Sequence, residues 1–220
     1  MNESKTHIAV VVDRSGSITS IRSDTIGGFN TFLRDQQAEP GEATLSLVLF
    51  DHEYQPVYTM RPLAEVPELT TETYVPRGNT ALLDAIGRTI NETGAALAAI
   101  PEAERPGRVV FVIITDGHEN SSREFNRYRV LEMIRHQSDV YGWQFVFLGA
   151  NQDAIVEAGS IGIKAANAVS YTASSVGVAN VIRHTSDNLR SYRRTGVAAD
   201  VGFSEHQRSE AMADSKDKTA

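Results

Sequence analysis

The sequence predicts an α/β domain with a mostly parallel β-sheet, helices on both faces and one antiparallel strand at an edge. Three short apolar runs are typical of strands that are buried on both faces, and segments with helical spacing alternate with them. The runs are HIAVVV (residues 7–12), VVFVII (109–114) and QFVFL (144–148). Because parallel strands need long crossover connections, this alternation favours a parallel sheet.

The first half of the chain contains a strand, a helix, a hairpin and a second helix. After the first apolar run, apolar residues between positions 18 and 33 recur at steps of three and four, which predicts a helix. Residues 44–50 and 57–60 are typical of two strands joined by a turn, so the second of them should run antiparallel. A loop with three prolines, residues 61–79, then leads into a helix that begins near Thr80.

The second half of the chain continues the alternation. Residues 121–124 fit a capping box and predict that a helix begins there. A short helix near 152–158, a short strand near 168–171 and a long helix capped by Ser174 follow. We therefore expect one domain over residues 5–195 and a loosely held polar tail over 196–220.

Composition excludes several classes of function. The chain has 220 residues, a net charge of -7 and no cysteine, so it has no disulfide framework, no thiolate zinc site and no cysteine nucleophile. The negative charge argues against a general nucleic-acid binder, which needs a basic face. The N-terminus shows no secretion signal, and no stretch reaches the length of a membrane span. We expect a cytoplasmic protein that does not contact membranes.

Oxygen-bearing side chains follow two of the predicted strands. Asp13, Ser15 and Ser17 come directly after the first run, and Asp116 comes directly after VVFVII. Ligands of open α/β sheets bind at the carboxyl ends of the strands, so these side chains should meet in one crevice if the two strands are neighbours. Two carboxylates and two hydroxyls suit Mg²⁺, Mn²⁺ or Ca²⁺ and disfavour zinc or copper.

The motifs DRSGS, GNT and TDG together resemble the von Willebrand factor A family. That family has the pattern Asp-x-Ser-x-Ser, a distant Thr and a distant Asp at a strand end, which form a metal-ion-dependent adhesion site. The matching positions here are Asp13, Ser15, Ser17, Thr80 and Asp116, in the same order.

The resemblance implies a Rossmann-like domain with a six-stranded sheet over roughly residues 5–195. It also implies that the two serines, with Thr80 or Asp116, bind the metal directly or through water. Asp13 would more often contact these ligands and not the metal itself. One coordination position would stay open for an acidic side chain of a protein partner. The expected function is a metal-dependent binding (adaptor) module, and not an enzyme.

Plainer interpretations of these and other residues remain open. Asp13 and Ser15 also fit a helix N-cap, and Asp116 fits an ordinary turn. We interpret residues 118–119 as a solvated loop and residues 51–53 as a hairpin turn. We interpret Arg77 as a plain surface arginine, with steering of an acidic partner as the alternative. The last helix is basic, and we interpret its end as solvated, with a nucleic-acid or phosphate contact as the alternative; its arginines are Arg183, Arg190, Arg193 and Arg194.

Two other functions compete with the binding module. The chain lacks the P-loop and nucleophile-elbow signatures, but a metal held by two aspartates could support hydrolysis of a phosphate ester. Haloacid-dehalogenase-type phosphatases have a second acid two residues after their first aspartate, where this chain has Ser15. The third possibility is a structural protein whose metal holds the loops together.

Overall fold

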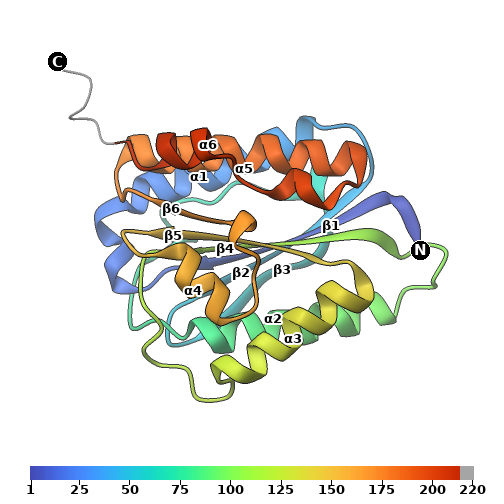
Figure 1. The fold of residues 1–220 in the computed structure, drawn as a ribbon, viewed down its shortest axis with the longest axis horizontal. Helices are drawn as coiled ribbons and strands as arrows, with labels where there is room; N and C mark the ends of the chain where they lie inside the picture. Colours follow the sequence, from blue (N-terminus) through green and yellow to red (C-terminus); the bar gives the residue numbers. More distant parts are fainter. Residues whose placement is uncertain (214–220) are drawn as a thin grey trace.

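The structure, a computed structural model, describes residues 1–213 and contains a six-stranded sheet between two layers of helices (Figure 1). The strands are β1 (Asn2–Asp13), β2 (Ala43–Phe50), β3 (Tyr54–Pro62), β4 (Pro106–Thr115), β5 (Gln144–Ala150) and β6 (Ala168–Tyr171). The helices are α1 (Arg22–Ala38), α2 (Leu82–Ala98), α3 (Arg127–Tyr141), α4 (Ala154–Ser160), α5 (Ser175–Thr195) and α6 (Glu205–Ala211).

The sheet has the order β3-β2-β1-β4-β5-β6, and every neighbouring pair is parallel except β2 and β3. The prediction of a doubly wound, mostly parallel sheet with one antiparallel edge strand is therefore confirmed. β1 and β4 lie side by side, with Val12 opposite Ile114. The order of strands reverses between these two, which is where open α/β sheets place their ligand crevice.

The two faces of the sheet are covered by different helices. Helices α1, α5 and α6 cover one face, and α2, α3 and α4 cover the other (Figure 1). Residues of β1 alternate between the two cores: Val10 packs with α1 and α5, whereas Ala9 and Val11 pack with α2 and α3. Because both faces of β1 are buried, its sequence is continuously apolar instead of alternating.

An aromatic cluster stabilises the core on the α2–α3 face. The ring of Phe111, on β4, lies 5.4 Å from that of Trp143 and 5.0 Å from that of Phe145. Phe111 has no exposed surface, and Trp143 is 5% exposed. Trp143 is thus a packing residue of the core, placed where α3 gives way to β5.

His7 is a buried polar side chain in β1. Its Nδ1 lies 2.9 Å from Thr44 Oγ1, and its Nε2 is buried with no partner among the described residues. Burial lowers the pKa of His7 to about 3, because the imidazolium form would lose its hydration. Between pH 6.5 and about pH 3, the His7 ring is therefore neutral in the folded protein and protonated in an unfolded chain.

Acid should destabilise the protein through His7. Below pH 6.5 the unfolded chain binds a proton at this residue and the folded chain does not, so the stability present above pH 6.5 is lost as the pH falls toward 3. Between pH 7 and pH 5 the loss from this group is about 2 kcal/mol. Urea unfolding at both pH values should show a smaller change for His7→Asn than for the wild type. An equal change in the two proteins would contradict the assignment.

The start of α3 differs from the prediction. The helix begins after Asn126, whose side chain accepts the N–H of Arg129, and not at the capping-box pattern of residues 121–124. The backbone amides of that segment are already taken. Glu119 accepts the N–H groups of the two serines there, and Asp84 accepts the three N–H groups that follow. One nearby carboxylate, that of Glu119, and one distant carboxylate, that of Asp84, therefore hold the segment as a loop.

The chain after α5 also differs from the loosely held tail expected from its composition. It forms a short 3-10 helix and then α6, where Ser204 and Gln207 make a capping box. Phe203 and Ala211 are buried against the core. Arg208 binds the backbone carbonyls of residues 165, 166 and 168, so α6 lies against the edge strand β6. Residues 214–220 of the expected tail lie outside the described part of the chain.

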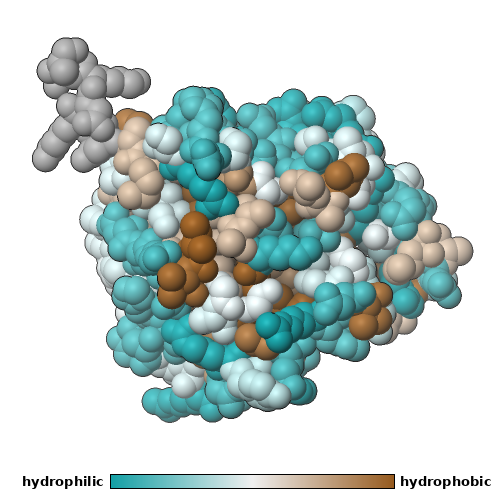
Figure 2. Space-filling view, viewed as in Figure 1, coloured by the Kyte–Doolittle hydropathy of each residue, from teal (hydrophilic) through white to brown (hydrophobic). Residues whose placement is uncertain are grey.

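No helix among residues 1–213 is long and apolar enough to cross a membrane. The surface in Figure 2 is mostly hydrophilic, with a hydrophobic patch over α4. Two exposed side chains of that helix, Ile155 and Val156, belong to this region.

Candidate metal centre

The predicted site residues lie at the carboxyl ends of β1 and β4. Asp13 is the last residue of β1, and Asp116 directly follows β4. Since the two strands are paired neighbours, their carboxylates open into the same crevice. Ser15 caps a short 3-10 helix (Gly16–Ile21) that contains Ser17 and leads into α1, and Thr80 lies two residues before the start of α2.

Three of these side chains form a continuous chain of hydrogen bonds. Ser15 Oγ lies 3.0 Å from Ser17 Oγ, and Ser17 Oγ donates to Asp116 Oδ1 at 2.7 Å. Ser15 is buried and Ser17 is exposed, so the chain runs from the interior to the surface. Side chains separated by 99 positions in sequence thus converge at one point.

The hydroxyl of Thr80 reaches the same place, next to Gly117. A β-carbon on Gly117 would lie 2.8 Å from Thr80 Oγ1 and 3.5 Å from Ser17 Oγ. Both hydroxyls therefore face this glycine, and a larger residue would fill the space between them. The Thr80 segment is fixed by Asn120, whose side chain accepts the Thr80 N–H at 2.9 Å.

Asp13 lies behind the serines. Its Oδ1 accepts the N–H of Ser15 at 2.7 Å, and its Oδ2 accepts the hydroxyl of Thr115 at 2.6 Å. The residue has no exposed surface. Both oxygens of Asp13 are already hydrogen-bonded, so its carboxylate orients the backbone at Ser15.

The charge of this crevice favours a cation. Burial raises the pKa of Asp13 to about 6; the hydrogen bonds from Thr115 and Ser15 act in the opposite direction, and the nearby Asp116 raises it further. Burial also raises the pKa of Asp116. Within residues 1–213, no basic side chain forms an ion pair with either aspartate. An ion bound between them would supply the missing positive charge.

The donor set fits a hard divalent cation. It offers two carboxylates and three hydroxyls, and such oxygen ligands suit Mg²⁺, Mn²⁺ or Ca²⁺. In the part of the chain that the structure describes, no three His, Cys, Asp or Glu side chains converge as a metal-binding group. The hydroxyls of Ser15, Ser17 and Thr80 would therefore have to contribute to any site here.

Some residues that build the site carry no signal in the sequence. The Tyr74 hydroxyl donates to the backbone oxygen of Asp13, and Asn120 fixes Thr80. Glu119, which we interpreted as part of a solvated loop, accepts the N–H of Leu83 and so caps α2. These contacts join positions far apart in the chain, and no local pattern marks them.

The arginines of α5 are engaged within the protein. Arg183 pairs with Glu210, and Arg190 and Arg194 both pair with Glu39. Arg193 is buried and donates to backbone oxygens where α1 ends, among them that of Gln36 at 2.6 Å. These contacts favour a structural role for the basic helix and not a phosphate contact.

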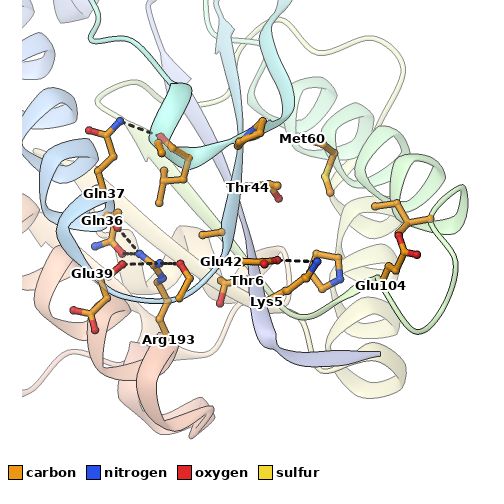
Figure 3. Close-up of a pocket in the computed structure, with 17 residues that line it drawn as sticks. Lys5, Thr6, Gln36, Gln37, Glu39, Glu42, Thr44, Met60, Glu104 and Arg193 are labelled. Atoms are coloured by element: carbon orange, nitrogen blue, oxygen red, sulfur yellow. Dashed lines mark hydrogen bonds and ion pairs between the residues drawn. The ribbon is translucent and has the colours of Figure 1, made fainter.

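Arg193 also lines a hollow of about 600 Å³ at the opposite end of the sheet (Figure 3). The hollow lies at the start of β1 and β2, between Gln36 on one side and Met60 on the other. It includes the Lys5–Glu42 ion pair, with 2.7 Å between the charged atoms. None of the five predicted metal-site residues lines it.

The fold is similar to that of several solved proteins. No family model and no curated protein sequence matches the chain. Proximal thread matrix protein 1 from the mussel byssus is 11% identical over 83% of this chain, with a TM-score of 0.62. A von Willebrand factor type A protein from Catenulispora acidiphila is 16% identical over 83% of it, with a TM-score of 0.54.

A second structure of the mussel protein is described as having a zinc-occupied MIDAS motif. It is 17% identical over 89% of this chain, with a TM-score of 0.52. The chain spans 47%, 42% and 45% of the lengths of these three solved chains, so in each case it matches less than half of the other protein. Together with the strand order, these similarities show that the chain has the von Willebrand factor type A fold.

Proposed function

We propose that this protein is a divalent-metal-dependent binding module that recognises an acidic side chain of a protein partner, without catalysing a reaction. The observation that carries the proposal is the hydrogen-bonded chain Ser15–Ser17–Asp116 at the strand ends, next to Asp13. Neither aspartate has a basic partner in the described residues. Mg²⁺ is the expected ion, with Mn²⁺ or Ca²⁺ as alternatives.

Hydroxyl ligands explain why such a site would bind a partner. Ser15, Ser17, Thr80 and Asp116 would hold the ion, and Asp13 would act through Ser15. Neutral hydroxyls withdraw little of the positive charge of the ion, so a bound cation would still attract a carboxylate from outside. Mg²⁺ also keeps exchangeable waters when a protein supplies only part of its ligands.

The surface position of the site supports the same function. Ser17 is exposed and Asp116 is partly exposed, so another protein can reach the site directly. The zinc-occupied MIDAS motif of the mussel protein supports metal binding by this fold. A cytoplasmic adaptor remains the role that we expect.

The first experiment is a pull-down from the native cell lysate with tagged protein, once in Mg²⁺ and once in EDTA. A protein that is retained with Mg²⁺, lost in EDTA and lost with Asp116→Ala would support the proposal. It should also lose binding when its own contacting acid is changed to the amide. Asp139→Ala is the matched control, because it removes an exposed carboxylate of α3 without affecting the site.

Three outcomes would contradict a binding module. Identical protein lists in Mg²⁺ and EDTA would show that the crevice does not recognise the partner. Metal-dependent turnover of a phosphate ester, abolished by Asp13→Asn, would indicate a phosphohydrolase. A metal that raises the melting temperature without any metal-dependent partner would leave a structural role for the ion.

A further inference from the structure

The turn between β2 and β3 contains a buried carboxylate that the proposed metal site does not include. Asp51 has no exposed surface. Its Oδ2 accepts from Arg14 Nε and from Arg77 Nε, each at 2.9 Å. Its Oδ1 accepts the N–H of Glu53 at 2.7 Å. We call Asp51, Arg14 and Arg77 the Asp51 cluster.

Both arginines of this cluster belong to segments that carry predicted metal ligands. Arg14 stands between Asp13 and Ser15, and Arg77 is three residues before Thr80. The Asp51 carboxylate therefore joins the loop after β1 to the loop before α2. Its own hydrogen bonds go to neither Ser15 nor Thr80, so it acts on them through the arginines.

Backbone hydrogen bonds also join the loop after β1, the turn at Asp51 and the loop before α2. The N–H of Arg77 donates to the Arg14 oxygen at 2.8 Å, and the N–H of Gly16 donates to the Gly78 oxygen at 3.1 Å. The N–H of Ala81 donates to the oxygen of Asp51 itself at 2.8 Å. The residues on either side of Thr80 are thus bound to the turn and to the loop that carries the serines.

At Gly78 the loop before α2 lies close against the turn between β2 and β3. Gly78 has a φ of +68°, and a β-carbon there would lie 2.0 Å from Nδ1 of His52. The loop backbone therefore rests directly on the turn that contains Asp51. A shift of that turn would be passed on to Thr80, because Ala81 is bonded to it.

We infer that Asp51 is a positioning residue of the metal site: through Arg14 and Arg77 it holds Thr80 in place against the Ser15–Ser17 loop. The inference rests on the proposed metal site and adds a residue that would not touch the ion. Partners of this kind behind metal ligands typically change metal affinity by about 10–100-fold when they are removed.

A charge effect and a positioning effect predict opposite results at Arg77. Removing a positive charge near a cation site should by itself strengthen metal binding. Removing a residue that positions Thr80 should weaken it. The Arg77 side chain is 48% exposed, so its replacement does not open a hole in the core. The sign of the change therefore separates the two explanations.

The experiment is a calorimetric titration of Mn²⁺ into the wild type, Arg77→Met and Asp51→Asn, at low salt and at about 0.5 M salt, where the effect of surface charge is screened. We expect both variants to bind Mn²⁺ at least about tenfold more weakly at both salt concentrations. The matched control is Asp200→Asn, a carboxylate that accepts the hydroxyls of Ser191 and Thr195 near the end of α5. It should bind Mn²⁺ as the wild type does.

Melting curves with and without Mn²⁺ separate positioning from general stability. In a positioning role, the rise in melting temperature caused by Mn²⁺ shrinks in Arg77→Met, whatever the melting temperature of the metal-free variant. Wild-type affinity or tighter binding in Arg77→Met would overturn the inference and leave the proposed site intact. A wild type that binds no Mn²⁺ would overturn both. If Asp51→Asn does not fold, the Mn²⁺ affinity of Arg77→Met still tests the positioning role.

Discussion

Replacing Asp116 with alanine should weaken Mn²⁺ binding by at least about tenfold, measured by calorimetric titration. Asp116 is the carboxylate that joins the hydroxyl chain, through the 2.7 Å bond from Ser17. Ser17→Ala should weaken binding in the same direction, because it removes one hydroxyl and interrupts the connection between Ser15 and Asp116.

Asp116→Ala, which weakens metal binding, should not lower the stability of the metal-free protein. Burial raises the pKa of Asp116, so its ionised form is disfavoured in the metal-free protein. Without metal, Asp116→Ala should therefore melt at the wild-type temperature or above it, while the increase caused by Mn²⁺ disappears. Asp139→Ala should keep the full increase. Unchanged Mn²⁺ affinity in both Asp116→Ala and Ser17→Ala would contradict the site assignment.

Replacing Phe111 with alanine should lower the free energy of unfolding by about 4 kcal/mol. Phe111 is fully buried in the central strand β4, and its ring packs against those of Trp143 and Phe145. Truncation would remove the apolar contacts and leave a cavity that neighbouring strands cannot close, because their backbones are fixed by pairing on both sides. Urea unfolding at neutral pH measures the change.

Phe111→Leu is the control for that experiment. Leucine keeps much of the volume and loses the aromatic contacts, so it should cost about 1–2 kcal/mol. Metal binding should be unchanged in Phe111→Leu, because the residue lies within the strand and not at its carboxyl end. Equal losses in the leucine and alanine variants would show that the aromatic contacts, and not the cavity, determine the effect.

The sheet could be predicted because its signal is local. A continuous apolar run such as residues 109–114 marks a strand buried on both faces, wherever that strand lies in the sheet. Because β1 and β4 are neighbours in the sheet, the motif residues at their carboxyl ends converge, as Ser17 and Asp116 show. The residue pattern left open whether these two strands are neighbours, and the resemblance to the von Willebrand factor A family implied the shared site.

The elements that were not predicted depend on distant partners. The capping-box pattern at residues 121–124 is a local signal, but Asp84, 39 positions from Arg123, accepts N–H groups of this segment and holds it as a loop. The sequence indicates only an ordinary hairpin turn at Asp51. Its role depends on Arg14 and Arg77, which come from other loops and donate to its carboxylate. The segment after α5 is polar on average, and a few apolar residues such as Phe203 are enough to fix it.

Both edges of the sheet have features that disfavour the addition of another strand. At one edge, β3 contains Pro56 and Pro62, which cannot donate a backbone hydrogen bond, and its register with β2 is interrupted. At the other edge, β6 has four residues, and Arg208 of α6 donates to the carbonyl oxygen of Ala168 there. These features disfavour β-augmentation, in which a strand of another protein pairs with an exposed sheet edge. They also work against intermolecular β-structure between copies of the sheet.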